Sequence, residues 1–156
     1  MIAVDPAKGA DCVLSDADLE AATNAPVNES ELDAYLPSAL VDCVRSEHVK
    51  NADVVFITLH GKYGEDGYIQ SLLDLHGVAY TGSGMLASGI AMDKGLTKML
   101  FQVGGIPTAY WINVKPEHAE DLEALDSVRR EVTGRVVVKP NDQGSTVGLS
   151  VVDAGS

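Results

Sequence analysis

The chain has 156 residues, of which 46% are hydrophobic, so a packed core is expected and extensive disorder is excluded. Its formal net charge of -12 argues against nucleic acid or an anionic membrane surface as the main partner. Only 11 residues are Lys or Arg, so each lysine beside a glycine-rich loop is informative about an anionic ligand.

Neither a targeting signal nor a membrane span is expected. No apolar run reaches the roughly 18 residues that cross a bilayer. The first residues, MIAVDPAKG, lack the basic and apolar stretches of a signal peptide. Cys12 and Cys43 form no CxxC pair and have no His cluster beside them, which fits a reducing compartment. We therefore expect a cytoplasmic protein.

The N-terminal part is predicted to begin with a very short strand, residues 1–4, which an Asp-Pro pair stops. Residues 7–50 are acidic and weakly patterned, but apolar residues recur at every fourth position from 32 to 44. This spacing predicts a helix ending near Val44, and Pro37 either interrupts that helix or opens it.

Strands and helices then alternate. Residues 54–59 form a continuous apolar, β-branched run, typical of a strand buried on both faces. The next stretch predicts a helix whose apolar face carries Ile69, Leu72 and Leu73 and which ends at Gly77. The segment VAYTGSG predicts a second short strand, and DKGLTKMLFQVGG predicts another helix.

The C-terminal part is predicted to contain a strand over 108–114, a helix over 116–134, and two strands, RVVVKP and LSVVD, that flank a glycine loop. The alternation up to about residue 95 predicts an α/β fold. The residues after about 98 read as the start of a second unit.

The motif HGKYGEDG, residues 60–67, follows the strand predicted over 54–59. Ligands in open α/β sheets bind beyond the carboxyl ends of the strands, so His60 and Glu65 are well placed to contact a small polar ligand. A purely structural role is an equally good interpretation, with Glu65 and Asp66 complementing the dipole of the following helix. Position alone leaves both interpretations open.

The motif TGSGMLA matches G-x-G-x-x-A, with Gly82, Gly84 and Ala87 between a predicted strand and a predicted helix. This is the context of a dinucleotide-binding turn. The acidic residue expected about 20 positions further on is missing, because Glu117 lies too far away. We therefore favour a turn that packs a helix close to a strand.

The motif MDKGLTK places Lys94 and Lys98 four residues apart, on one face of a predicted helix. For Lys98 we expect an ordinary solvated helix face. Lys94 lies at the start of the helix and is the better candidate for contact with a phosphate.

The motif VVVKPNDQGSTVG is not a Walker A loop, because G-x-x-x-x-G-K-[ST] does not occur in the chain. It has the same ingredients in reverse order, with Lys139 before Gly144, Ser145 and Thr146. The N–H groups of a small loop can cradle a phosphate, and a lysine can supply the charge. An ordinary hairpin remains the alternative.

Taken in order, these motifs resemble the D-alanine–D-alanine ligases of the ATP-grasp superfamily. The series HGxxGEDG, YTGSG, AMDKxxTK and GIPT is highly specific to that family, and the matching stretches cover roughly residues 52–112 and 135–152. The resemblance implies a Rossmann-like preATP-grasp domain with a parallel sheet over residues 1–95. The first part of an ATP-grasp α+β domain would follow over residues 96–156.

The resemblance also implies a reaction. The family uses ATP and Mg²⁺ to phosphorylate the carboxylate of one D-alanine, and the amine of a second D-alanine then attacks the acyl phosphate. The dipeptide is a precursor of peptidoglycan, the polymer of the bacterial cell wall. A reaction of this kind needs cations where charge develops and a lid that excludes water.

The resemblance assigns roles to nine residues. Lys94 and Lys139 match the two lysines that contact the ATP phosphates. His60 matches a histidine near the first D-alanine, and Glu65 matches an acidic residue of the same loop. Ser145 matches a serine that orients substrate, which makes it the expected catalytic residue. The glycine-rich loop that covers the phosphates corresponds to Gly144, Ser145, Thr146, Val147 and Gly148.

Two departures limit what we expect of the chain alone. The family begins with another strand and a loop carrying a glutamate for the first D-alanine. It also continues beyond the equivalent of residue 156 with the Mg²⁺-binding carboxylates and an arginine, and residues 149–156 hold no acidic pair to replace them. No metal ligand is therefore expected here. We expect a fragment that is inactive alone, binds nucleotide weakly or not at all, and is marginally stable or oligomeric, for example a homodimer.

Two alternatives stay open. The chain resembles other ATP-grasp carboxylate–amine ligases too, with the D-alanyl–D-lactate ligases nearest. A non-catalytic remnant that folds and binds a partner or a nucleotide weakly is the other interpretation.

Overall fold

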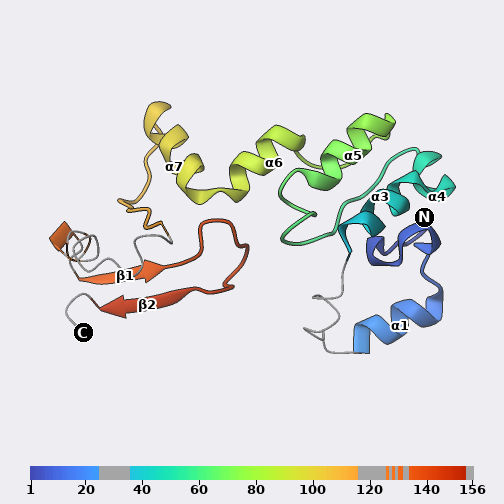
Figure 1. The fold of residues 1–156 in the computed structure, drawn as a ribbon, viewed down its shortest axis with the longest axis horizontal. Coiled ribbons are helices and arrows are strands. Elements are labelled where there is room, and N and C mark those ends of the chain that lie inside the picture. The colour runs from blue at the N-terminus through green and yellow to red at the C-terminus, as the bar shows by residue number, and fades with distance from the viewer. Residues whose placement is uncertain (25–35, 116–125, 127, 129, 132–133, 154–156) are drawn as a thin grey trace. The chain divides into compact units, whose positions relative to one another are not determined.

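The computed structural model describes residues 1–24, 36–115, 126, 128, 130–131 and 134–153. They belong to two compact units, Met1–Ala87 and Ser88–Ser156. Helices dominate the first unit, and the second combines helix with a strand hairpin (Figure 1). The mixed helix-and-strand class predicted from the sequence is confirmed.

The first unit is built from short helices: η1 Pro6–Asp11, α1 Asp16–Asn24, α3 Pro37–Arg45, α4 Glu47–Lys50 and α5 Tyr68–His76. A further helix, α6 Met85–Met92, spans the division between the units. Pro37 occupies the first turn of α3, where its missing N–H costs nothing, so it opens the helix rather than interrupting it. Gly77 ends α5 with a left-handed φ of 68°, as predicted.

The core of the first unit lies where η1, α3 and α5 pack together. Its buried members are apolar side chains and two thiols: Cys12, Leu40, Cys43, Val44, Val49, Ile69, Leu73 and Val78. Ile69 and Leu73 lie one helical turn apart in α5, so both reach this core. Leu73 has no exposed surface, and its truncation to Ala would remove about 2–5 kcal/mol from the free energy of unfolding.

The strand predicted over 54–59 is present only as one parallel bridge, between Val55 and Tyr80. Its hydrogen bonds join Val55 N to the Ala79 oxygen at 2.8 Å and Thr81 N to the Val55 oxygen at 3.0 Å. The expected burial on both faces is wrong. Alternate side chains of an extended segment point to opposite faces, and here one face is half-buried on the core while Phe56 is 73% exposed.

The short strand predicted over residues 1–4 likewise forms a single bridge, antiparallel, between Val4 and Val13. Two backbone hydrogen bonds support it, from Asp5 N to the Cys12 oxygen at 2.8 Å and from Leu14 N to the Ala3 oxygen at 3.0 Å. The preATP-grasp parallel sheet therefore stays a prediction.

In the second unit, helix α7 covers Lys94–Val103, as the pattern predicted. The two predicted C-terminal strands are confirmed as β1 Arg135–Val138 and β2 Ser150–Asp153, which pair antiparallel with Arg135 opposite Asp153. Lys139 follows β1 directly, and the glycine loop joins the two strands (Figure 1).

Two other predictions for this unit have different outcomes. Residues 108–114 carry no strand, because the described part of the chain supplies no ladder partner for them. The helix predicted over 116–134 falls for the most part outside the described residues. The chain divides at Ala87–Ser88, while the domain limits of 1–95 and 96–156 remain a prediction. Within the described ranges, no helix combines the length and apolar character needed to cross a bilayer.

Candidate functional site

The loop over residues 60–67 is a tight turn held by its own carboxylates. The Glu65 carboxylate accepts a hydrogen bond from the backbone N–H of Gly61 at 2.6 Å, and its other oxygen lies 3.8 Å from Nδ1 of His60. Gly61 has a left-handed φ of 70°. Glu65 therefore shapes the loop, which supports the structural interpretation of this acid.

Asp66 and Gln70 complete the turn. Asp66 accepts hydrogen bonds from Tyr63 N at 3.0 Å and from Tyr68 N at 3.4 Å, at the start of α5. Gln70 is buried and donates to the Gly64 oxygen at 3.0 Å. The turn is thus fixed from both sides, and it presents the His60 side chain, 90% exposed, to solvent.

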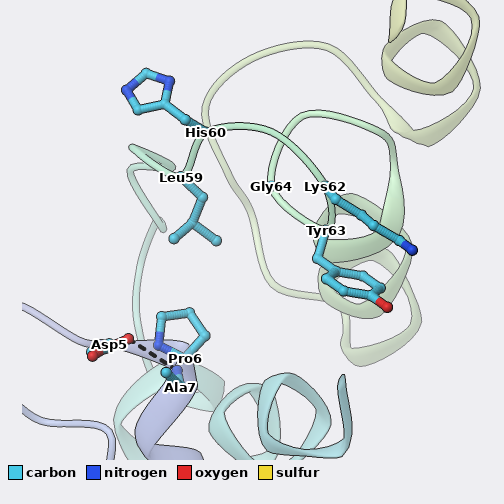
Figure 2. A pocket seen from close by; sticks show the side chains of 8 residues that line it. All are labelled: Asp5, Pro6, Ala7, Leu59, His60, Lys62, Tyr63 and Gly64. Atoms are coloured by element: carbon cyan, nitrogen blue, oxygen red, sulfur yellow. Dashed lines mark hydrogen bonds between the residues drawn. The ribbon is translucent and has the colours of Figure 1, made fainter. Parts of the chain in front are cut away.

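A small hollow of about 110 Å³ lies beside this turn (Figure 2). Leu59 and Pro6 face each other across it, and the His60 ring lies at its outer side. The complete lining is Asp5, Pro6, Ala7, Leu59, His60, Lys62, Tyr63 and Gly64. The Asp5 carboxylate accepts from Ala7 N at 2.9 Å, so it serves the local backbone.

The TGSGMLA motif does not pack in the way predicted. Among the residues that the structure describes, a Cβ on Gly82 would meet nothing within 4 Å, and one on Gly84 would meet only the Tyr80 hydroxyl at 3.8 Å. The close approach to α6 occurs instead at Gly67, where a Cβ would lie 2.6 Å from the Met85 oxygen. The glycine that the packing requires is therefore in the preceding motif.

Lys94 opens α7 and contacts the loop that follows β1. Its backbone N–H donates to the Asn141 oxygen at 3.0 Å, and its ammonium donates to the oxygens of Asn141, at 3.3 Å, and Gln143. The structure thus brings together two motifs that are separate in the sequence, MDKGLTK and VVVKPNDQGSTVG. Lys94 and Lys139 belong to one local arrangement.

Polar side chains converge on the first turn of α7 at Gly95, which is buried. A Cβ there would lie 2.9 Å from Nδ2 of Asn113, 3.2 Å from Oδ1 of Asn141 and 3.4 Å from Oδ1 of Asp93. Hydrogen bonds from the Leu96 N–H and then from the Asn141 side chain lower the pKa of Asp93. Only glycine leaves room for this cluster.

Lys98 is not on a solvated face, so that expectation is wrong. Its ammonium donates to the Thr108 hydroxyl at 2.9 Å and to the Ala109 oxygen at 3.0 Å. Through these hydrogen bonds Lys98 connects the segment after α7 to the helix. The sequence did not predict this contact, because the spacing of Lys98 along the helix would be the same for a lysine that is fully exposed to solvent.

The glycine loop is exposed and turns sharply twice. Ser145 has a left-handed φ of 51° and Gly148 one of 65°. Gly148 folds against Pro140, whose Cγ would lie 2.7 Å from an added Cβ. Within the loop, Val147 N donates to the Gly144 oxygen at 3.4 Å and Leu149 N to the Thr146 oxygen at 3.1 Å. Ser145 and Thr146 are both exposed.

The charged and polar groups of Lys94, Lys139 and the glycine loop are suited to binding an anion. Lys139 is exposed directly after β1, and the described residues give its ammonium no hydrogen-bond or ion-pair partner. With the Lys94 ammonium and the loop hydroxyls, it supplies the cationic and donor groups that phosphate oxygens require. In the part of the chain that the structure describes, no three His, Cys, Asp or Glu side chains gather as metal ligands do.

The predicted site residues fall in both units. His60 and Glu65 lie in the first, and Lys94, Lys139 and the loop Gly144–Gly148 lie in the second. Sequence reasoning missed Asp93, Gly95 and Asn141. Asp93 carried a detectable signal, since an Asp before a helix is a common N-cap. Asn141 carried none, because its partners lie 46 and 47 positions away.

Comparison with known proteins finds similarity to one family of ligases. Residues 11–83 match the family model "D-ala D-ala ligase N-terminus". A D-alanine–D-alanine ligase from Magnetococcus marinus is 47% identical over 98 residues, which is 63% of this chain and 32% of that protein. The chain spans about a third of the length of the curated relatives it matches.

Solved structures agree. The chain is similar to a D-alanine–D-alanine ligase from Bacillus anthracis complexed with ATP, with 38% identity, a TM-score of 0.57 and coverage of 70% of this chain and 35% of that one. It is also similar to the VanG D-Ala:D-Ser ligase from Enterococcus faecalis, with 31% identity, a TM-score of 0.58 and coverage of 65% and 29%. The predicted resemblance to the D-alanine–D-alanine ligase family is confirmed.

Proposed function

We propose that this chain, with its resemblance to the D-alanine–D-alanine ligases, works in the ATP-dependent joining of two D-alanine molecules for peptidoglycan synthesis. The contact of Lys94 with the loop of Lys139 carries the proposal. It gathers two of the chain's few cations beside a hydroxyl-bearing turn, against an overall charge of -12. Relatives named D-alanine–D-alanine ligase support the choice of reaction.

On the phosphate side, Lys94 and Lys139 bind the phosphates of ATP. The Lys94 ammonium uses two of its three N–H groups on the oxygens of Asn141 and Gln143, which leaves one to donate to a phosphate. Lys139 adds an exposed charge. The loop from Gly144 to Gly148, with Thr146 and Val147 at its exposed tip, covers the phosphates and keeps water from the acyl phosphate.

On the substrate side, the exposed imidazole of His60 contacts the first D-alanine, and Glu65 holds the turn that presents it. Ser145 orients the substrate beside the phosphates through its hydroxyl. The left-handed backbone of Ser145 supports this role, since strain of this kind is common where a side chain must be aimed at a ligand.

ATP supplies the phosphoryl group that makes the D-alanine carboxylate reactive. Mg²⁺ is expected for the family, but no set of candidate ligands lies in the described ranges, so we assign no metal ligand to this chain. We also propose the preATP-grasp and ATP-grasp domains over 1–95 and 96–156, a cytoplasmic location, and a homodimer without nucleic-acid or membrane partners.

A second substrate class is favoured by one observation. The structure of a D-Ala:D-Ser ligase is as similar in fold as those of the D-alanine–D-alanine ligases. In our main proposal the second substrate is D-alanine. In the alternative it is D-serine or a D-hydroxy acid such as D-lactate. Competition between these acceptors in one reaction mixture separates the two.

The proposal is tested by grafting. The chain replaces the matching third of a D-alanine–D-alanine ligase, and phosphate release from ATP and Mg²⁺ is followed with and without D-alanine. We expect release that depends on D-alanine and is lost in Ser145→Ala. The matched control is Lys50→Ala, which removes an exposed lysine that pairs with Glu47. A folded graft that releases no phosphate, or one that Ser145→Ala leaves unaffected, would contradict the proposal and favour a non-catalytic binding role.

A further inference from the structure

Asn141 contacts the first turn of α7 through both its backbone and its side chain. Its carbonyl oxygen accepts from Lys94 N at 3.0 Å and from Lys94 Nζ at 3.3 Å, and its Oδ1 accepts from Gly95 N at 2.8 Å. These three hydrogen bonds, here called the Asn141 clasp, join segments 46 and 47 positions apart in the chain. They fix the loop after β1 onto the helix.

The Asn141 clasp provides hydrogen-bond acceptors for backbone N–H groups at the start of α7. The first four N–H groups of an α-helix lack partners within the helix. In α7 these are the N–H groups of the N-cap Asp93 and of the next three residues. Lys94 N and Gly95 N donate to Asn141, Leu96 N donates to the Asp93 side chain, and Asp93 N donates to the Gly89 oxygen at 3.4 Å. All four are therefore occupied by the protein. A phosphate would have to bind at the lysine ammonium groups and the glycine loop, not at the helix end.

The clasp also sets where those ammonium groups lie. Asn141 follows Lys139 by two residues, so fixing its backbone fixes the start of the loop. The same carbonyl oxygen holds the Lys94 ammonium. We propose that Asn141 is a positioning residue, which holds Lys94 and the loop of Lys139 at the separation that one polyphosphate requires. This inference rests on the proposed function, because it deepens the same phosphate site.

A structural role and a positioning role predict different results. If Asn141 only stabilised the unit, its loss would lower the melting temperature and leave the phosphate affinity of the folded chain unchanged. If it positions the lysines, Asn141→Ala weakens ATP binding by the folded chain. The loss of one neutral hydrogen bond corresponds to about a fivefold change in the dissociation constant.

The test is a nuclear magnetic resonance titration of the full chain with ATP, which measures weak binding and reports each amide separately. Asn141→Ala should shift the Gly95 amide signal, because that N–H loses its acceptor, and should weaken ATP binding about fivefold. Gly95→Ala provides a second variant, since its added Cβ would lie only 3.2 Å from Asn141 Oδ1 and would push that oxygen away. Asn51→Ala is the matched control, an exposed asparagine that pairs with Glu47, and should bind ATP as the unaltered chain does.

Parallel weakening in Asn141→Ala and Gly95→Ala, with Asn51→Ala unchanged, supports the inference. A shifted Gly95 signal with unchanged ATP affinity overturns the inference alone and leaves the proposed function in place. If the unaltered chain shows no ATP-dependent shift by itself, the same variants are compared for ATP binding in the grafted ligase. Absence of ATP binding there too overturns the phosphate site of the proposed function, and the inference with it.

Discussion

The ammonium of Lys94 donates a hydrogen bond to the backbone oxygen of Asn141, 47 positions later in the chain, at 3.3 Å. The contact joins the start of α7 to the loop that carries Lys139. Lys94 and the loop of Lys139, which are far apart in the sequence, therefore belong to one local arrangement.

Lys139→Ala should weaken ATP use without weakening the fold. The side chain is exposed and the described residues give it no partner, so its removal leaves no buried group unsatisfied. A charged hydrogen bond to phosphate is worth about 1.5–3 kcal/mol, which corresponds to at least a tenfold rise in the KM for ATP. Steady-state kinetics of the grafted ligase measure it. Lys50→Ala serves as the control, and a KM that is equal in both variants would exclude Lys139 from the site.

His60 and Glu65 should respond differently. His60→Ala removes an exposed ring, so we expect a raised KM for D-alanine and an unchanged melting temperature. Glu65→Ala removes the acceptor of the Gly61 N–H, so it should lower the free energy of unfolding by about 1–3 kcal/mol and raise the same KM indirectly. Calorimetry and kinetics on both variants provide the comparison. Loss of stability in His60→Ala alone would reverse these two roles.

Gly64→Ala should destabilise the first unit. A Cβ at this position would lie 2.5 Å from the Leu59 Cβ and 3.0 Å from the Leu59 carbonyl carbon, so the backbone must shift. Overpacking of this kind costs about 1–3 kcal/mol. Gly84→Ala is the matched control, because its methyl group would lie 3.8 Å from the Tyr80 hydroxyl, which is an ordinary contact. Denaturant unfolding curves that coincide for the two variants would show that the 60–67 turn is not rigid.

Acid should loosen the start of α7 through Asp93. Hydrogen bonds from the Leu96 N–H and the Asn141 side chain lower the pKa of this carboxyl below its ordinary value. Because the pKa of Asp93 is lower in the folded state, its carboxylate stabilises the fold above the pKa of the unfolded state, about 3.9. This stabilisation is lost as the pH falls through the pKa of the folded state. Asp93→Asn should lower stability at neutral pH and flatten the decline below about pH 4. Urea midpoints measured against pH provide the test, and equal slopes would remove Asp93 from this role.

The local features of the fold could be predicted from the sequence. Pro37 and Gly77 act within one helical turn, so propensity and capping rules identified the helices near them. The strand over 54–59 was predicted with the wrong burial. A continuous apolar run does not show whether both faces find partners, and in the structure Phe56 remains exposed.

The sequence motifs predicted the residues of the candidate site, but not the contacts between them. Lys94 and Lys139 were recognised as lysines beside glycine-bearing turns. The sequence gives no sign that Asn141 joins them, or that Lys98 donates to Thr108 and Ala109, because these contacts depend on how distant segments pack. Whether His60 and Glu65 act with the lysines stays a prediction.

In the proposed reaction, a D-alanine carboxylate attacks the γ-phosphate of ATP to form an acyl phosphate and release ADP, and the amine of the second D-alanine then displaces phosphate from the acyl carbon. One carboxylate oxygen must leave with that phosphate. The most direct measurement gives D-alanine labelled with oxygen-18 in its carboxylate to the grafted ligase and weighs the released phosphate by mass spectrometry. Each released phosphate should carry a single labelled oxygen, and Lys139→Ala should slow its release. Unlabelled phosphate, formed by attack of water on ATP, would exclude the acyl phosphate.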